Sequence, residues 1–298
     1  MQYLLVLLIA LLTACESPRA PEPPPAPTAS EAPPEPSVAP SAAPVPKEQP
    51  VLSTYSTPLE GNEARQFNVG HAAAALDWQT LPPGSQFSFN ETVGPRTEAR
   101  GYKSAPQYVA QALADGVGGG VCQVSSTLYV AAMYGGLKVT KRYAHSRPVS
   151  YTPLGTDAAV LDGELDLAFL NPYEDILTIR AGVEDGRLVV TILGREPKWE
   201  VTRIDHGGVA LTEPPIQHVK SPYATKPRII QQGKPGFSRT AIWVYTSKVD
   251  PQIAFKRLVR SRYKPVPEIW VVPQDDEWTD QELEQGWRPS RDAGEDDG

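Results

Sequence analysis

The stretch GGGVCQVSSTLY at residues 118–129 leads three consecutive glycines into the strongest candidate helix of the chain, which we expect over residues 121–133. Apolar positions recur there at the spacing of one helical face, and Gly135-Gly136 is a helix stop signal. The apolar face consists of Val121, Val124, Leu128, Ala131 and Ala132. A helix with one apolar face is predicted to pack against a sheet.

Short segments on both sides of this helix have the pattern of strands. Downstream, we expect strands over residues 139–143, 147–151, 165–169, 176–181 and 188–193, with a hairpin turn at Asp185-Gly186. Upstream, an Ala-rich helix within residues 62–76 precedes a turn at residues 81–84, and a strand follows over residues 86–90, with Phe87 and Phe89 on one face. One main helix that follows a Gly-rich loop and packs on a largely antiparallel sheet predicts an α+β fold.

Cys122 lies in the first turn of the predicted helix, where free N–H groups and the helix dipole stabilise a thiolate. The preceding glycines would let another backbone or a ligand approach the sulfur. His145 could take the thiol proton, and Asp157 could orient the imidazole. These three are our candidate catalytic residues. The alternatives are a buried structural cysteine, a polar residue that closes a strand, and a turn residue.

Other residues around this segment are candidates for holding a substrate. We predict substrate contacts from Gly118, Gly119, Gly120, Gln123, Ser125, Arg96 and Arg147. The two arginines could each grip a carboxylate, although a surface ion pair is commoner, and Ser125 could instead cap the helix. A zinc site of Cys122, His145 and His71 lacks a closely spaced ligand pair, so we predict no metal and no other cofactor.

Several blocks of the sequence resemble, in order, the VanW family, which is named for an accessory protein of vancomycin-resistance clusters. They are RQFN at 65–68, PGSQFSFN at 83–90, VGPRT at 93–97, GY at 101–102, the Cys122 segment, and YTPLGTDA at 151–158. The resemblance covers residues 62–194, but at 106–116, where members often have a short strand and turn, this chain is rich in Ala and Gln. It implies an envelope domain associated with peptidoglycan and no established reaction. The Cys122 segment is also similar to that of transglutaminase-like and papain-like thiol enzymes, whose histidine lies further along the chain.

Composition divides the chain into five segments. We expect a lipoprotein signal peptide at 1–14, a lipid anchor and Pro/Ala-rich disordered stalk at 15–50, the VanW-like domain at 57–200, an all-β module at 214–273 and an acidic disordered tail at 274–298. Strands are expected in the module at 229–233, 240–246, 253–259 and 267–272. Its motifs QGKPGF at 232–237 and YKPVPE at 263–268 resemble the five-glycine-repeat domain, which implies glycan binding. Trp243 and Trp270 could stack on sugars or pack in the core.

The N-terminal segment predicts where the protein resides. An apolar run ending in Leu12-Thr13-Ala14-Cys15 resembles the bacterial lipobox, which implies cleavage before Cys15 and its acylation, whereas an ordinary secretory signal is the alternative. The protein would be exported and held by lipid, at the outer membrane facing the periplasm if the cell has two membranes. Acylation of Cys15 would leave Cys122, the second of two cysteines, without an intramolecular partner.

These observations favour a thiol-dependent enzyme acting on peptidoglycan. Cys122 would attack a carbonyl of a wall peptide in a peptidase or transpeptidase-like acyl transfer, and N–H groups after Gly120 would stabilise the oxyanion. The alternative is a non-catalytic accessory protein that binds or scaffolds peptidoglycan, in which the glycines admit a wall peptide into a groove. The net charge of −7 argues against nucleic acid as a partner.

Overall fold

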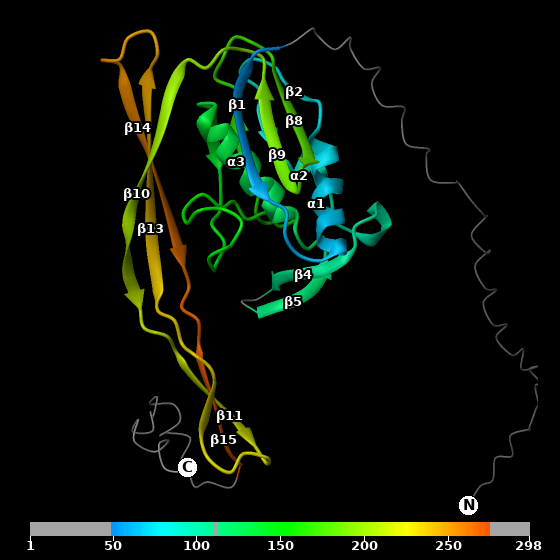
Figure 1. Cartoon of the computed structure of the whole chain (residues 1–298), viewed down its shortest axis with the longest axis vertical. Coiled ribbons are helices and arrows are strands. Elements are labelled where there is room, and N and C mark those ends of the chain that lie inside the picture. The colour runs from blue at the N-terminus through cyan, green and yellow to red at the C-terminus, as the bar shows by residue number, and fades with distance from the viewer. Residues whose placement is uncertain (1–48, 110–111, 275–298) are drawn as a thin grey trace, which may run out of the picture. The chain divides into compact units, whose positions relative to one another are not determined.

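The computed structural model describes residues 49–109 and 112–274. The predicted signal peptide, Cys15, nearly all of the stalk and the acidic tail beyond residue 274 lie outside the described residues. The described part is a mixed α+β structure rich in antiparallel sheet (Figure 1), which confirms the predicted fold class at that level.

In residues 49–109 and 112–274, no helix is both long enough and apolar enough to cross a membrane.

The central sheet has four antiparallel strands in the order β1-β9-β8-β2. Their bounds are β1 Val51–Pro58, β9 Arg187–Leu193, β8 Leu177–Glu184 and β2 Gln79–Leu81. Asp185 and Gly186 join β8 to β9 with φ values of 47° and 71°, the two positive angles that a type I′ hairpin turn requires. The predicted hairpin is therefore confirmed.

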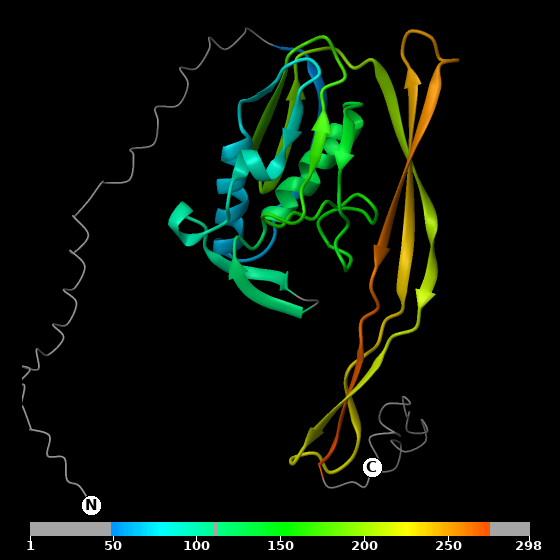
Figure 2. The ribbon, with the colours of Figure 1, turned by 180° about the vertical axis from the view of Figure 1, so that it is seen from behind.

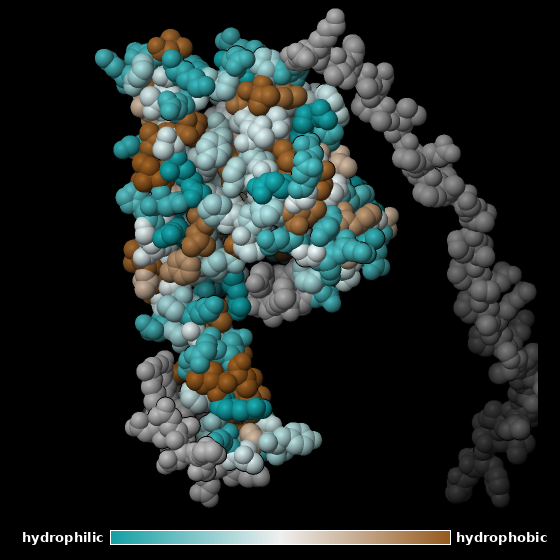
Figure 3. All heavy atoms as spheres, viewed as in Figure 1, coloured by the Kyte–Doolittle hydropathy of each residue, from teal (hydrophilic) through white to brown (hydrophobic). Residues whose placement is uncertain are grey.

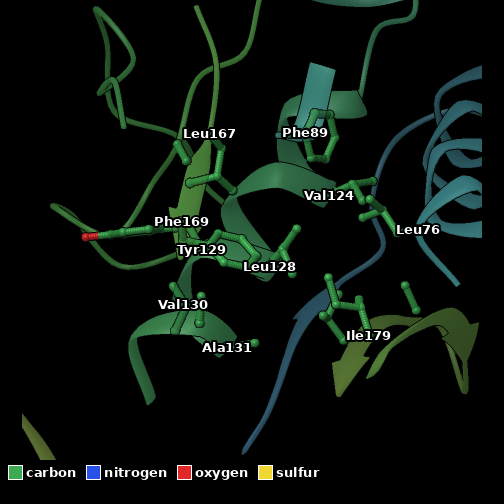
Figure 4. Close-up of a cluster of buried hydrophobic side chains, with 14 of the residues drawn as sticks. Leu76, Phe89, Val124, Leu128, Tyr129, Val130, Ala131, Leu167, Phe169 and Ile179 are labelled. Atoms are coloured by element: carbon green, nitrogen blue, oxygen red, sulfur yellow. The ribbon is translucent and has the colours of Figure 1, made fainter. Parts of the chain in front are cut away.

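Two helices, α1 (Glu63–Leu76) and α3 (Val121–Tyr134), lie against the same face of this sheet (Figures 1 and 2). Asn62 begins α1, because its side chain accepts a hydrogen bond from the Arg65 N–H at 2.9 Å. Side chains of both helices and of the sheet form one buried cluster, part of which is drawn in Figure 4. It includes Leu76, Val124, Leu128 and Ile179, each at most 1% exposed.

Helix α3 is buried on nearly every side, which differs from the single apolar face that we predicted. Ser125, Ser126 and Thr127 are fully buried with the apolar residues. Their hydroxyls can be buried because each donates a hydrogen bond to a backbone carbonyl, at 2.6 to 2.7 Å for the shortest bond of each. The helix thus forms the centre of the domain.

The smaller elements correct several predictions. They are β3 Gln86–Ser88, α2 Phe89–Val93, the 3-10 turn η1 Glu98–Arg100, the hairpin β4 Ser104–Val109 and β5 Ala112–Val117, β6 Lys138–Lys141 and β7 Ala168–Leu170. The strand predicted over 86–90 ends at Ser88, because the Ser88 hydroxyl accepts from the Glu91 N–H at 3.2 Å and caps α2. The strand predicted over 147–151 is an irregular segment instead.

The β-rich C-terminal part begins at Trp199, before the predicted boundary at 214. One sheet has the order β10-β13-β14 and the other β11-β15-β12, in which β11 and β15 are parallel. Their bounds are β10 Trp199–Thr212, β11 Ile216–Ser221, β12 Arg228–Gln231, β13 Gly236–Ser247, β14 Ala254–Tyr263 and β15 Glu268–Pro273. Figure 3 shows hydrophobic side chains between hydrophilic ones over this region.

Strand β13 joins the same hydrophobic cluster as α3. Ala241, Trp243 and Tyr245 are completely buried in it, and the Tyr245 hydroxyl donates to the Met133 carbonyl at 2.9 Å. Trp243 is therefore a core residue and does not present its indole ring to a sugar. This packing brings the neighbouring strand β14 to the segment that holds Asp157.

Candidate functional site

Cys122 is the second residue of α3 and is partly exposed. Its thiol lies 3.5 Å from the Val160 carbonyl. The amides on either side are engaged, since the Val121 N–H donates to the Gly118 carbonyl and the Gln123 N–H to the Gly120 carbonyl. Within residues 49–109 and 112–274, the Cys122 N–H donates to no acceptor. A partly open sulfur therefore lies beside an unused donor at the positive end of a helix.

His145 and Asp157 are joined by two hydrogen bonds. The Asp157 Oδ2 atom accepts from the His145 backbone N–H at 2.6 Å and from its ring Nδ1 at 2.8 Å. A carboxylate on Nδ1 fixes the proton there and leaves Nε2 as the nitrogen that can interact with Cys122. The three predicted catalytic side chains are thus brought together, although they come from separate segments of the chain.

Two residues that sequence reasoning missed hold the other oxygen of Asp157. Arg142 donates to Oδ1 at 3.1 Å, and the hydroxyl of Tyr263 on β14 donates to it at 3.0 Å. The Asp157 side chain is only 1% exposed, so its charge needs these partners. Arg142 lay inside a predicted strand, and the sequence did not indicate which way its side chain would point. Tyr263 is 106 residues from Asp157, and no local pattern links them.

The protonation of these groups follows from their contacts. Burial raises the pKa of the Cys122 thiol, but its hydrogen bond to His145 and the positive charges of His145 and Arg96 outweigh burial and lower it. Burial lowers the pKa of His145, but hydrogen bonds to Asp157 and Cys122 raise it to about 9. Burial also raises the pKa of Asp157, while His145 and Arg142 bring it below its usual value. Near neutral pH these directions favour a thiolate, an imidazolium and a carboxylate.

The Asp157 segment is held in place by the serines of α3. The Ser125 hydroxyl donates to the Ala158 carbonyl at 2.6 Å, and the Ala158 N–H donates to the Ser126 hydroxyl at 2.9 Å. Preceding the aspartate, Gly155 has a φ of 83° and donates its N–H to the Tyr263 hydroxyl at 2.9 Å. Ser125 therefore positions the carboxylate segment and does not face a substrate.

The protein itself occupies the space where a Cβ atom of each of the three glycines would lie, while their predicted contact with a substrate stays a prediction. A Cβ atom on Gly118 would lie 2.8 Å from the Arg96 Cβ, and one on Gly120 would lie 2.9 Å from the Arg65 Cγ. One on Gly119 would overlap the carbonyl oxygen of Ala105. The glycines therefore allow close packing of the protein around the start of α3.

Two of the other residues predicted to contact a substrate, Gln123 and Arg96, make hydrogen bonds within the protein. The Gln123 amide is fully buried and bonded to Thr57, Pro58 and Arg65, so it ties α3 to β1. The Arg96 Nη1 atom donates to the Asn90 side chain at 2.9 Å and to the Gly94 carbonyl at 3.0 Å, and its side chain is 9% exposed.

Arg147 differs from Arg96, because its Nε atom is buried without a hydrogen-bond partner among the residues described. The predicted carboxylate contact from this side chain stays a prediction.

The zinc alternative gains no support, since His71 Nε2 lies 2.8 Å from the Arg100 carbonyl. In the described ranges, no three His, Cys, Asp or Glu side chains are arranged to hold a metal ion.

A cavity of about 180 Å³ has Gln123, the residue after Cys122, in its lining. The lining also includes Glu60, Arg65, Ser150 and Tyr151. The Tyr151 hydroxyl is also 3.4 Å from that of Ser126, which donates to the Cys122 carbonyl. The site therefore combines a thiol with an adjacent polar recess.

Comparison with known proteins places this site within one matched segment. Residues 64–193 match the family described as VanW like protein. The protein YoaR of Bacillus subtilis (strain 168) is 45% identical over 131 residues, which cover 44% of this chain and 43% of YoaR. The vancomycin B-type resistance protein VanW of Enterococcus faecalis (strain ATCC 700802 / V583) is 25% identical over 152 residues, or 49% of this chain and 55% of that protein. The chain thus spans about half the length of the curated relatives it matches.

Proposed function

We propose that this chain, whose residues 64–193 form a VanW-like domain, is an envelope enzyme that transfers acyl groups on peptides of peptidoglycan. One observation carries the proposal: Cys122 begins a helix beside His145, and the His145 ring is bonded to the buried carboxylate of Asp157. This is the arrangement by which an imidazole activates a thiol and a third group orients the imidazole. The VanW-like domain supports a role at the cell wall.

The reaction proceeds through a thioester. The Cys122 thiolate attacks the carbonyl carbon of a peptide bond, and the Cys122 N–H donates to the oxyanion that forms. Nε2 of His145 gives its proton to the leaving amine as the C–N bond breaks, so an acyl group remains on the sulfur. Water or the amine of a second peptide then attacks the thioester, His145 takes its proton, and the thiolate leaves. Water gives hydrolysis and an amine gives transpeptidation.

The polar cavity beside the thiol is suited to a peptide that carries charged groups. Glu60 and Arg65 line it, so it presents both signs of charge within reach of Cys122. Arg147 has a buried Nε donor without a partner among the described residues, and we assign it to a carboxylate of the substrate. These features favour a wall peptide over an uncharged glycan as the group bound at the thiol.

The proposed location follows from the N-terminal sequence. Acylation of Cys15 would fix the chain to a bacterial membrane, and the Pro-rich segment that follows would separate the domain from that membrane. We propose that glycan strands contact the C-terminal strands. Mass spectrometry of the N-terminal peptide from membrane fractions, with Cys15→Ala as control, tests the lipid directly.

The catalytic proposal is tested by incubating peptidoglycan sacculi with the full chain or with its Cys122→Ala variant. Mass spectrometry of the released and cross-linked muropeptides should show changes with the wild type that the variant does not produce. Sacculus co-sedimentation of both proteins is measured in parallel. Identical muropeptide profiles with equal co-sedimentation would reject the enzyme and leave the non-catalytic binding protein.

A further inference from the structure

A second cavity, of about 360 Å³, is lined by the edge strands of two sheets and does not include Cys122 in its lining. Strand β6 is the outer strand of the sheet β3-β7-β6, and β14 is the outer strand of β10-β13-β14. The cavity is lined by residues 138–140 of β6, by residues 257–260 of β14 and by part of α3. It is twice the volume of the cavity beside Cys122 (360 against 180 Å³).

The charge of this second cavity is positive. Lys138, Arg142, Arg257 and Arg260 line it, and none of its lining residues within the described ranges is acidic. Arg257 is held in position because it donates to the carbonyls of Gly136 and Leu137. Arg142 uses Nε and Nη2 on Asp157, while its Nη1 makes no hydrogen bond to a described residue. Lys138, Arg257 and Arg260 face no acidic lining residue, and together with Arg142, whose charge is paired with Asp157, they predict an anionic ligand.

A buried hydroxyl lacks a partner at the same place. Tyr129 lines the cavity, is 1% exposed, and its hydroxyl is bonded to no atom of residues 49–109 and 112–274. Burial raises the pKa of Tyr129 to about 12, so the hydroxyl retains its proton as a donor. A buried donor without an acceptor is destabilising, and an oxygen of a ligand would supply the missing acceptor.

We propose that the cavity between β6 and β14 binds a phosphate group through Lys138, Arg142, Arg257 and the Tyr129 hydroxyl. The donors come from α3, β6, the residue after β6, and β14, so they approach from several sides. This suits the tetrahedral oxygens of a phosphate better than the two oxygens of a planar carboxylate. Because Arg142 also holds Asp157, the phosphate site adjoins the thiol site, but it does not depend on catalysis by Cys122.

The test is isothermal titration of the full chain, in non-ionic detergent at constant ionic strength, with inorganic phosphate and with sodium chloride as the control. We expect saturable binding of phosphate. Tyr129→Phe removes only the hydroxyl, and since that group has no partner in the described part of the protein, the variant should fold normally. It should bind phosphate about tenfold more weakly, the loss expected for one hydrogen bond to a charged group.

A charge-matched pair of variants separates the site from general surface charge. Lys138→Ala should weaken phosphate binding, whereas Lys141→Ala, on the same strand but outside the lining, should not. Vesicles of phosphatidylglycerol and a soluble poly(glycerol phosphate) then distinguish a lipid headgroup from a polymer as the source of the phosphate. The proposal is overturned by equal affinities of wild type and Tyr129→Phe, or by equal losses in the two lysine variants.

Discussion

Replacing Cys122 by alanine should make the free energy of unfolding depend more strongly on pH than it does in the wild-type protein. In the folded state the pKa of His145 is raised to about 9 from the usual 6.5, so His145 contributes stability that is complete below pH 6.5 and is lost as the pH rises to about 9. The pKa of Cys122 is lowered from 9.0, and this contributes stability that develops as the pH rises toward 9. Between pH 6.5 and 9 the two effects oppose each other, because a rise in pH removes the stability that His145 contributes and adds the stability that Cys122 contributes.

The magnitude follows from the shift of the imidazole. A rise in pKa from 6.5 to about 9, at roughly 1.4 kcal/mol per unit, corresponds to at most about 3.5 kcal/mol. Asp157 supplies part of this shift and remains in the variant, whereas the contribution of Cys122 is lost. The free energy of unfolding of Cys122→Ala should therefore fall by about 1–3 kcal/mol between pH 6.5 and 9, while that of the wild type should fall less because the lowered Cys122 pKa opposes the change.

Urea unfolding followed by tryptophan fluorescence at several pH values measures this difference. Adding His145→Gln to Cys122→Ala serves as the control, because it removes the titrating imidazole and should abolish the slope. A free energy of unfolding that is equally level in Cys122→Ala and in the double variant would refute the ion pair between Cys122 and His145.

Two further predictions concern Asp157 and Gly119. Asp157→Asn removes the charge that supports the His145 imidazolium, so the rate of iodoacetamide labelling of Cys122 at neutral pH should fall about tenfold or more. Asp162→Asn, at an aspartate with a half-exposed side chain, should leave the rate unchanged, and equal rates in the two variants would contradict the proposed role of Asp157. Gly119→Ala should destabilise the fold by about 3 kcal/mol, because its Cβ would overlap the Ala105 carbonyl. Gly182→Ala is the control, because a Cβ there meets nothing within 4 Å, and it should change the urea midpoint little. If Gly119→Ala lowers the midpoint no more than Gly182→Ala does, the overlap with the Ala105 carbonyl is relieved and the prediction is wrong.

Features governed by local sequence could be predicted. The Asp185-Gly186 hairpin needs two positive φ angles, and its residues adopt such angles readily. Helix α3 was expected over 121–133 and spans Val121–Tyr134. The juxtaposition of Cys122, His145 and Asp157 was also predicted, from the helix start and the order of residues along the chain.

Features governed by distant partners were not predicted. Strand β1 was missed because residues 51–58 follow the Pro-rich segment directly and acquire strand character by pairing with β9. The alternation around Phe89 suggested a strand, but the Ser88 cap starts a helix there. Strand β10, which begins before residue 214, was not predicted because it pairs with β13, far along the chain.

The hydroxyl of Tyr263 bears on how this architecture can be rearranged by recombination. The segment that matches the family model ends at residue 193, yet one of the donors to its aspartate comes from β14, beyond that limit. A hybrid that keeps residues 64–193 and receives a foreign C-terminal half would retain the thiol, Arg142 and His145 but lose the Tyr263 hydroxyl. A phenol supplied at the same place by the new half would restore the fourth hydrogen bond to the buried carboxylate.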